Sequence, residues 1–147
     1  MAMKTYREYV ELFQEPEHGL ESMRVLQGGS LKGRETRGKK LPAEIIEALI
    51  WGLDHESPVV RRNCLEILDA HPDHSAIPHI IRKLEDPVPR VRWHAVHALV
   101  CDVCKVGDSF VNDDVIVRLR SVAENDPSKK VRNYARRELE QAGAWPV

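Results

Sequence analysis

The sequence predicts an all-α fold, a right-handed α-α superhelix of three helical hairpins preceded by an atypical helical cap. Two observations lead to this fold class. The segment from Leu84 to Leu99 recurs with the same residue types 31 residues earlier and 40 residues later, and such an internal repeat is typical of stacked helical units. Within each copy, apolar residues also recur at the spacing of one helix face. The matched positions are Leu53 with Leu84, Pro58 with Pro89, Val60 with Val91 and Val131, Arg61 with Arg92 and Arg132, Cys64 with Ala95 and Ala135, and Leu68 with Leu99 and Leu139.

The composition is that of one soluble domain spanning residues 1–147. The net charge is −1, so no overall field selects nucleic acid or a membrane, and any electrostatic preference has to come from local clusters. No segment approaches the ~18 consecutive apolar residues of a spanning helix, and the first residues lack the apolar region of a signal peptide. Three cysteines are too few for a disulfide framework, which favours a reducing compartment. We therefore expect a cytoplasmic protein with no membrane contact.

The first 40 residues do not match the repeat. Residues 1–27 are expected to form an N-terminal helical cap, because Tyr6, Val10 and Phe13 are spaced as one helix face and a stack of repeats needs an atypical unit over its first exposed core face. Residues 28–40 contain four glycines and many basic residues against one acid. They predict a basic, glycine-rich loop, either a solvated connection or an arm that orders on a phosphate-bearing or acidic partner.

Three predicted repeats follow, each made of two helices. Repeat 1 covers residues 41–72, and its second helix begins at Pro58, a residue that suits the first turn of a helix. Repeat 2 covers residues 73–111, and its second helix is expected to run from about Pro89 to Val103. Repeat 3 covers residues 112–143 and ends near Gly143. A longer connection between the second and third repeats explains the larger offset.

Residues 41–142 resemble the HEAT repeat, in particular the short variety of phycobilisome-lyase-type proteins. The resemblance rests on the Asp-Pro turns at Asp86 and Asp126, on the Val-Arg pair that opens each second helix, and on the small residue and leucine that follow. It implies that the second helices line a concave side. It also implies that each turn carboxylate caps a helix and faces an arginine of its own or a neighbouring repeat. His55, at the position that matches Asp86, departs from this pattern.

One face of the second helices is the candidate partner-binding surface. A rotation of 100° per residue places Arg90, Trp93 and His97 about 120° away from the core arc. Aromatic rings flanked by arginines are typical of binding hot spots, although the same mixture also suits stacked bases and phosphates. We predict a scaffold for a protein or peptide partner, with nucleic acid as one alternative and a solvated face on which Trp93 packs against a neighbouring helix as another. The predicted site residues are Arg62, Glu66, Arg90, Trp93, His94, His97, Lys130, Asn133, Tyr134 and Arg137.

A metal site on one helix is not expected. His94, His97, Cys101 and Cys104 share a helical face, but they span ~15 Å of helix axis. The ligands of one zinc ion lie within about 4 Å of one another, so at most two adjacent members could share an ion. We therefore predict no metal and no cofactor, and we expect Cys64 to serve packing.

Enzymes form the second class of function that the resemblance suggests. HEAT-like families include bilin lyases, a deoxyhypusine hydroxylase that holds iron with His-Glu pairs on successive repeats, and alkylpurine DNA glycosylases. The pair His55-Glu56 has no counterpart at Asp86-Pro87, which argues against the hydroxylase, and only Glu66 offers a clear carboxylate on the candidate face. No catalytic residue is predicted.

The apolar tail that ends in Trp145, Pro146 and Val147 lies beyond the last predicted helix. Trp145 either folds back over the open end of the stack or contacts a second copy of the chain, because an uncapped end invites association. The predicted partners therefore include a homo-oligomer formed through this end.

Overall fold

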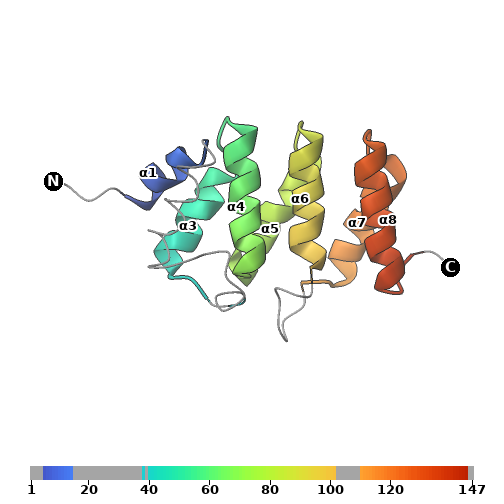
Figure 1. The fold of residues 1–147 in the computed structure, drawn as a ribbon. Helices are drawn as coiled ribbons and strands as arrows, with labels where there is room; N and C mark the ends of the chain where they lie inside the picture. The colour runs from blue at the N-terminus through green and yellow to red at the C-terminus, as the bar shows by residue number, and fades with distance from the viewer. Residues whose placement is uncertain (1–4, 15–37, 39, 102–109, 146–147) are drawn as a thin grey trace.

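The computed structural model describes residues 5–14, 38, 40–101 and 110–145, and every regular element in them is helical. The predicted all-α class is confirmed. Figure 1 shows the helices stacked along the molecule from the N-terminus to the C-terminus. The α-helices are α1 (Tyr6–Glu11), α3 (Ala43–Gly52), α4 (Pro58–Ala70), α5 (Ile77–Arg82), α6 (Pro89–Val100), α7 (Asp113–Asn125) and α8 (Lys129–Gln141), and the 3-10 segments are η1 (Leu12–Gln14), η2 (His74–Ala76) and η3 (Lys83–Glu85).

Consecutive helices pair into hairpins, and the second helices pack on one another. Within the hairpins α3 contacts α4, α5 contacts α6 and α7 contacts α8, whereas α4 contacts α6 and α6 contacts α8. In Figure 1 the helices α4, α6 and α8 accordingly run side by side across the stack. This arrangement makes one continuous surface of second helices.

Local sequence signals set the helix boundaries. Pro58 and Pro89 open α4 and α6, where a residue without an N–H leaves no donor unsatisfied. The side chain of Asn112 caps α7 by accepting from the Val115 N–H. The expected extension of the 89–103 helix to Val103 is wrong, because α6 ends at Val100 and Cys101 is already in an extended conformation. The backbone therefore leaves the helical conformation at Cys101.

Small residues sit where the helices approach most closely. Cys64, Ala95 and Ala135 are fully buried, as their positions in the repeat predict, and burial raises the pKa of the Cys64 thiol. A Cβ atom on Gly52 would lie 2.5 Å from Cys64 Sγ and 2.6 Å from a methyl group of Val10. Glycine is therefore required where α3 meets both α4 and α1.

The N-terminal helix covers the first hairpin. Val10 and Phe13 are fully buried against it, and the Asn63 side-chain amide of α4 donates to the Phe13 carbonyl oxygen at 2.8 Å. Thr5 and Glu8 form a reciprocal capping box at the start of α1. The remaining predicted cap residues 15–27, and most of the predicted loop 28–40, lie outside the described residues.

Buried arginine–aspartate pairs connect one hairpin to the next. Arg61 of α4 donates to both carboxylate oxygens of Asp86, at 2.8 and 3.1 Å, and Arg92 of α6 donates to both oxygens of Asp126, at 2.7 and 2.9 Å. Asp86 and Asp126 also accept the backbone N–H two residues ahead. The ladder implied by the repeat spacing is confirmed, with each arginine facing the neighbouring repeat.

His55 continues this arrangement with different chemistry. Its Nδ1 accepts the Ser57 N–H at 2.9 Å, as the aspartates do in the later repeats. Since Nδ1 accepts, the proton is on Nε2, which donates to the Glu11 carboxylate of α1 at 2.7 Å. His55 therefore pairs with Glu11 of the N-terminal helix, at the repeat position where Asp86 and Asp126 pair with arginines.

Candidate functional site

The predicted site residues lie on α4, α6 and α8, the second (B) helix of each repeat. We call the surface that these residues form the B-helix face. Arg90, Lys130, Asn133 and Arg137 are exposed, and Arg62, Glu66, Trp93, His94 and His97 are partly buried. Tyr134 differs from the rest, because only 7% of it is exposed. All predicted site residues except Tyr134 are therefore at least partly exposed at the surface.

Stacked rings join α6 to α8 at the centre of this face. The rings of Trp93 and Tyr134 are 4.4 Å apart at 19°, and those of Trp93 and His97 are 5.5 Å apart at 8°. His97 Nδ1 and the Tyr134 hydroxyl oxygen form a hydrogen bond of 2.6 Å. Burial is the largest cause that raises the pKa of Tyr134, and the Glu138 carboxylate is the second. The hydroxyl therefore stays protonated. We call the packed rings of Trp93, His97 and Tyr134 the aromatic ledge. Trp93 contacts the neighbouring helix α8, as it does in the alternative in which this face only packs and is solvated.

Histidine–carboxylate contacts join α4 to α6. Glu66 lies 3.9 Å from His94, and Asp69 lies 3.2 Å from His97 Nε2. Burial, then the nearby Arg62, lowers the pKa of His94 to about 4. His94 is therefore neutral at physiological pH, and the positive charge of this face comes from its arginines and from Lys130.

Asp69 is the residue of this network that the sequence argument missed. It lies three residues after Glu66, so continuing the same helical arc along α4 would have included it. Lys130 and Asn133 are exposed, and like Arg62 and Arg90 they make no hydrogen bond or ring contact with the ledge within the described part of the chain. The site is thus a connected cluster on α4, α6 and α8 with these four side chains beside it.

Some cations of the B-helix face have no acidic partner. Among the described residues, this holds for Arg90 and Lys130. Arg137 places its guanidinium 5.2 Å from the Tyr134 ring centroid, and its side chain remains 62% exposed although Glu138 lies at 3.8 Å. The two carboxylates of the cluster, Glu66 and Asp69, face histidines. A negatively charged ligand would thus meet exposed cations around the aromatic ledge.

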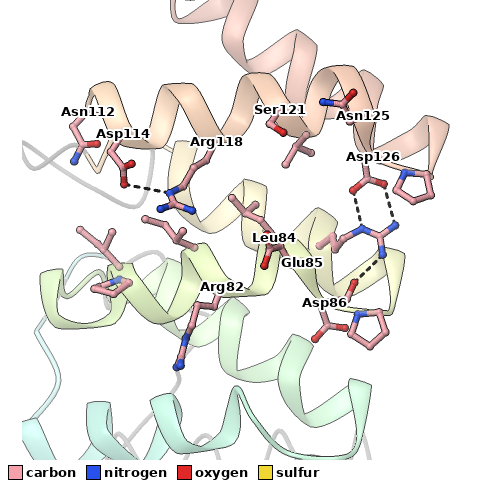
Figure 2. A pocket seen from close by; sticks show the side chains of 17 residues that line it. Arg82, Leu84, Glu85, Asp86, Asn112, Asp114, Arg118, Ser121, Asn125 and Asp126 are labelled. Carbon is pink, nitrogen blue, oxygen red and sulfur yellow. Dashed lines mark hydrogen bonds and ion pairs between the residues drawn. The ribbon is translucent and has the colours of Figure 1, made fainter.

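A hollow of about 980 Å³ lies on the other layer of the stack, between α5 and α7. Figure 2 shows α7 along one wall and α5 along the other, with the Arg92–Asp126 pair at one end. Apolar side chains of Ile81, Leu84 and Val122 line it. Arg118 on its rim is already paired with Asp114 at 3.3 Å. This hollow therefore offers apolar surface, and two of the cations that line it, Arg92 and Arg118, are paired with aspartates.

The turn histidine gives no support to an iron site of the hydroxylase kind, which the sequence already argued against. The His55–Glu56 pair does not form a shared site, because His55 uses both ring nitrogens for Ser57 and Glu11. None of the helices in the described part of the chain combines the length and the apolarity needed to span a bilayer.

Comparison with known proteins agrees with the repeat architecture. The sequence pattern of the family described as HEAT repeats matches residues 46–143. No curated protein matches the chain. The matched segment contains the helices α4 to α8, the arginine–aspartate ladder and the whole B-helix face. The chain belongs to the HEAT-repeat family, and its fold is an α-solenoid.

Proposed function

We propose that this protein is a non-catalytic scaffold that binds an acidic segment of a partner protein through the B-helix face. HEAT repeats generally mediate protein interactions and are typically non-catalytic. The observation that supports the proposal is a group of exposed cations around the aromatic ledge: Arg90 and Lys130 have no acidic partner among the described residues, and Arg137 remains 62% exposed beside Glu138. Such a surface attracts carboxylates by charge and contacts side chains through the ring faces.

The contrast with the α5–α7 hollow supports this choice of surface. There Arg118 is neutralised by Asp114, and Arg92 is buried with Asp126. An acidic partner would have to break these pairs to gain a cation, whereas Arg90 and Lys130 on the B-helix face have no acidic partner among the described residues.

Charge reversal tests the proposed surface. Peptides displayed from a random library are selected on the wild-type chain and on the Arg90→Glu/Arg137→Glu variant, and the binding of purified selected peptides is measured by fluorescence anisotropy. We expect the wild type to select peptides rich in Asp and Glu, and we expect the variant to bind them roughly 100-fold more weakly, because each lost pair becomes a repulsion.

The matched control reverses an arginine on the other layer. Arg118→Glu changes the net charge in the same direction without touching the B-helix face, and it should retain wild-type peptide affinity. Equal losses in the control and in the double variant would place the binding surface elsewhere. Single-stranded DNA and RNA are titrated in parallel, and tight binding that falls steeply with added salt would replace the protein partner with nucleic acid.

A further inference from the structure

We propose that Asp69, His97 and Cys101 form a binding site for a transition-metal ion of the zinc class. One ligand atom from each of these residues lies within 4.8 Å of the other two. His97 lies on α6, Cys101 is the residue that directly follows this helix, and Asp69 comes from the adjacent helix α4. The inference concerns the ion alone and does not depend on the proposed protein partner.

The donor set suits an ion of intermediate softness. A carboxylate oxygen, an imidazole nitrogen and a thiolate sulfur are all established zinc ligands. Binding releases the thiol proton to solvent, since the metal ligand is the thiolate. The two negative charges of Asp69 and Cys101 then balance the divalent cation, with His97 as the neutral third ligand.

Contacts at both ring nitrogens orient His97 for coordination by one of them. Its Nε2 points at the Asp69 carboxylate at 3.2 Å, and its Nδ1 meets the Tyr134 hydroxyl at 2.6 Å. When Nε2 binds the metal, Nδ1–H donates to the Tyr134 oxygen, which is the outer hydrogen bond that metal-binding histidines commonly make. The stacked Trp93 ring holds the plane of the imidazole.

The spacing requires only a small local closure. Bonds of about 2.0 to 2.3 Å to a tetrahedral ion place the ligand atoms roughly 3.3 to 3.8 Å from one another. The present spread of up to 4.8 Å closes to this range by side-chain rotation. The Cys101 side chain starts from an extended backbone directly after α6. The His97 side chain is 35% exposed, so a water molecule can occupy the fourth position.

This site differs from the one that the sequence argued against. That site needed four residues of a single helix, which span ~15 Å of helix axis, so at most two adjacent members could share an ion. Here His97 of α6 and Cys101, directly after α6, are two such members, and Asp69 supplies the third ligand across the α4–α6 contact. His94 faces Glu66 instead, which makes it a suitable control.

Cobalt titration of the reduced full-length chain tests the site. We expect a thiolate-to-cobalt charge-transfer band and visible bands of tetrahedral intensity, both removed by added zinc. Asp69→Asn, His97→Gln and Cys101→Ser should each weaken cobalt binding at least about ten-fold, and Cys101→Ser should also abolish the charge-transfer band. Tyr134→Phe, which removes only the hydroxyl group, should weaken cobalt binding roughly 10- to 100-fold.

Two variants serve as controls. His94→Gln changes a histidine on the same helix, and Cys104→Ser changes a cysteine that lies outside the described residues; both should keep the wild-type affinity. The thermal unfolding midpoint provides a second readout, since zinc should raise it for the wild type and not for Cys101→Ser. Absence of the charge-transfer band in the wild type, or equal loss in either control, would overturn the proposal.

Discussion

His94 is held as a neutral imidazole by its surroundings. Burial is the largest cause, followed by the positive charge of Arg62, and together they lower its pKa from 6.5 to about 4. The unfolded chain therefore takes up a proton at His94 between pH 6.5 and 4, where the folded chain does not. Stability from this residue is fully present above pH 6.5 and is lost as the pH falls. The wild type should lose about 2 kcal/mol more free energy of unfolding between pH 7 and 5 than His94→Gln does.

Urea unfolding of both chains at several pH values, followed by circular dichroism, measures this difference. The comparison between the two chains cancels the other titrating groups that they share. At pH 8 the imidazole is neutral in both the folded and the unfolded states, so the difference between the chains there reports packing alone. Parallel curves of stability against pH would contradict the lowered pKa of His94.

At the scale of elements, the arginine–aspartate pairs decide how one hairpin sits on the next. Arg92 of α6 and Asp126, which follows α7, are both buried and share two hydrogen bonds. Asp126→Asn keeps the shape of the side chain but leaves the Arg92 guanidinium buried without a counter-ion. Removing one partner of a buried pair costs about 3 to 5 kcal/mol, and we expect a loss of this size in the free energy of unfolding.

The matched control for this prediction lies on α7, the helix that Asp126 follows. Asp114 pairs with Arg118, but their side chains are 65% and 51% exposed. Asp114→Asn should therefore change stability by no more than about 1 kcal/mol, because solvent screens an exposed pair. Denaturant titrations of both variants give the two values, and equal losses would show that burial does not strengthen the Arg92–Asp126 link.

At the scale of the whole molecule, the features that could be predicted from sequence are those that follow from the internal repeat. The offsets of 31 and 40 residues located the paired helices, and the spacing of Asp86 and Arg92 indicated the ladder. The rotation along each helix also identified most exposed members of the B-helix face. These features depend on position within a repeat, which the sequence records directly.

Contacts between repeats were less accessible to the same reasoning. Burial of Tyr134 depends on how closely α8 approaches α6, and the clustering of Asp69 with His97 depends on the approach of α4. The hollow between α5 and α7 likewise depends on the spacing of two hairpins. Helical periodicity defines directions around one axis but gives no distance between two axes.

The C-terminal end of the stack gives the last prediction. Arg120 of α7 donates two hydrogen bonds to the Ala144 carbonyl oxygen, at 3.0 and 2.9 Å, and the Arg136 guanidinium lies 5.3 Å from the Trp145 ring centroid. Trp145 is partly buried against its own chain. A chain that ends at Gly143 should therefore lose roughly 1 to 3 kcal/mol of stability through the lost apolar contact and hydrogen bonds.

Sedimentation measures whether the same residues join two copies. We expect the full chain and the chain that ends at Gly143 to have the same oligomeric state, because the Trp145 ring already packs within its own chain. A full chain that sediments as a dimer, together with a truncated chain that sediments as a monomer, would instead show that Trp145 contacts a second copy. In that case the stability of the full chain would rise with protein concentration, since association favours the folded state by mass action.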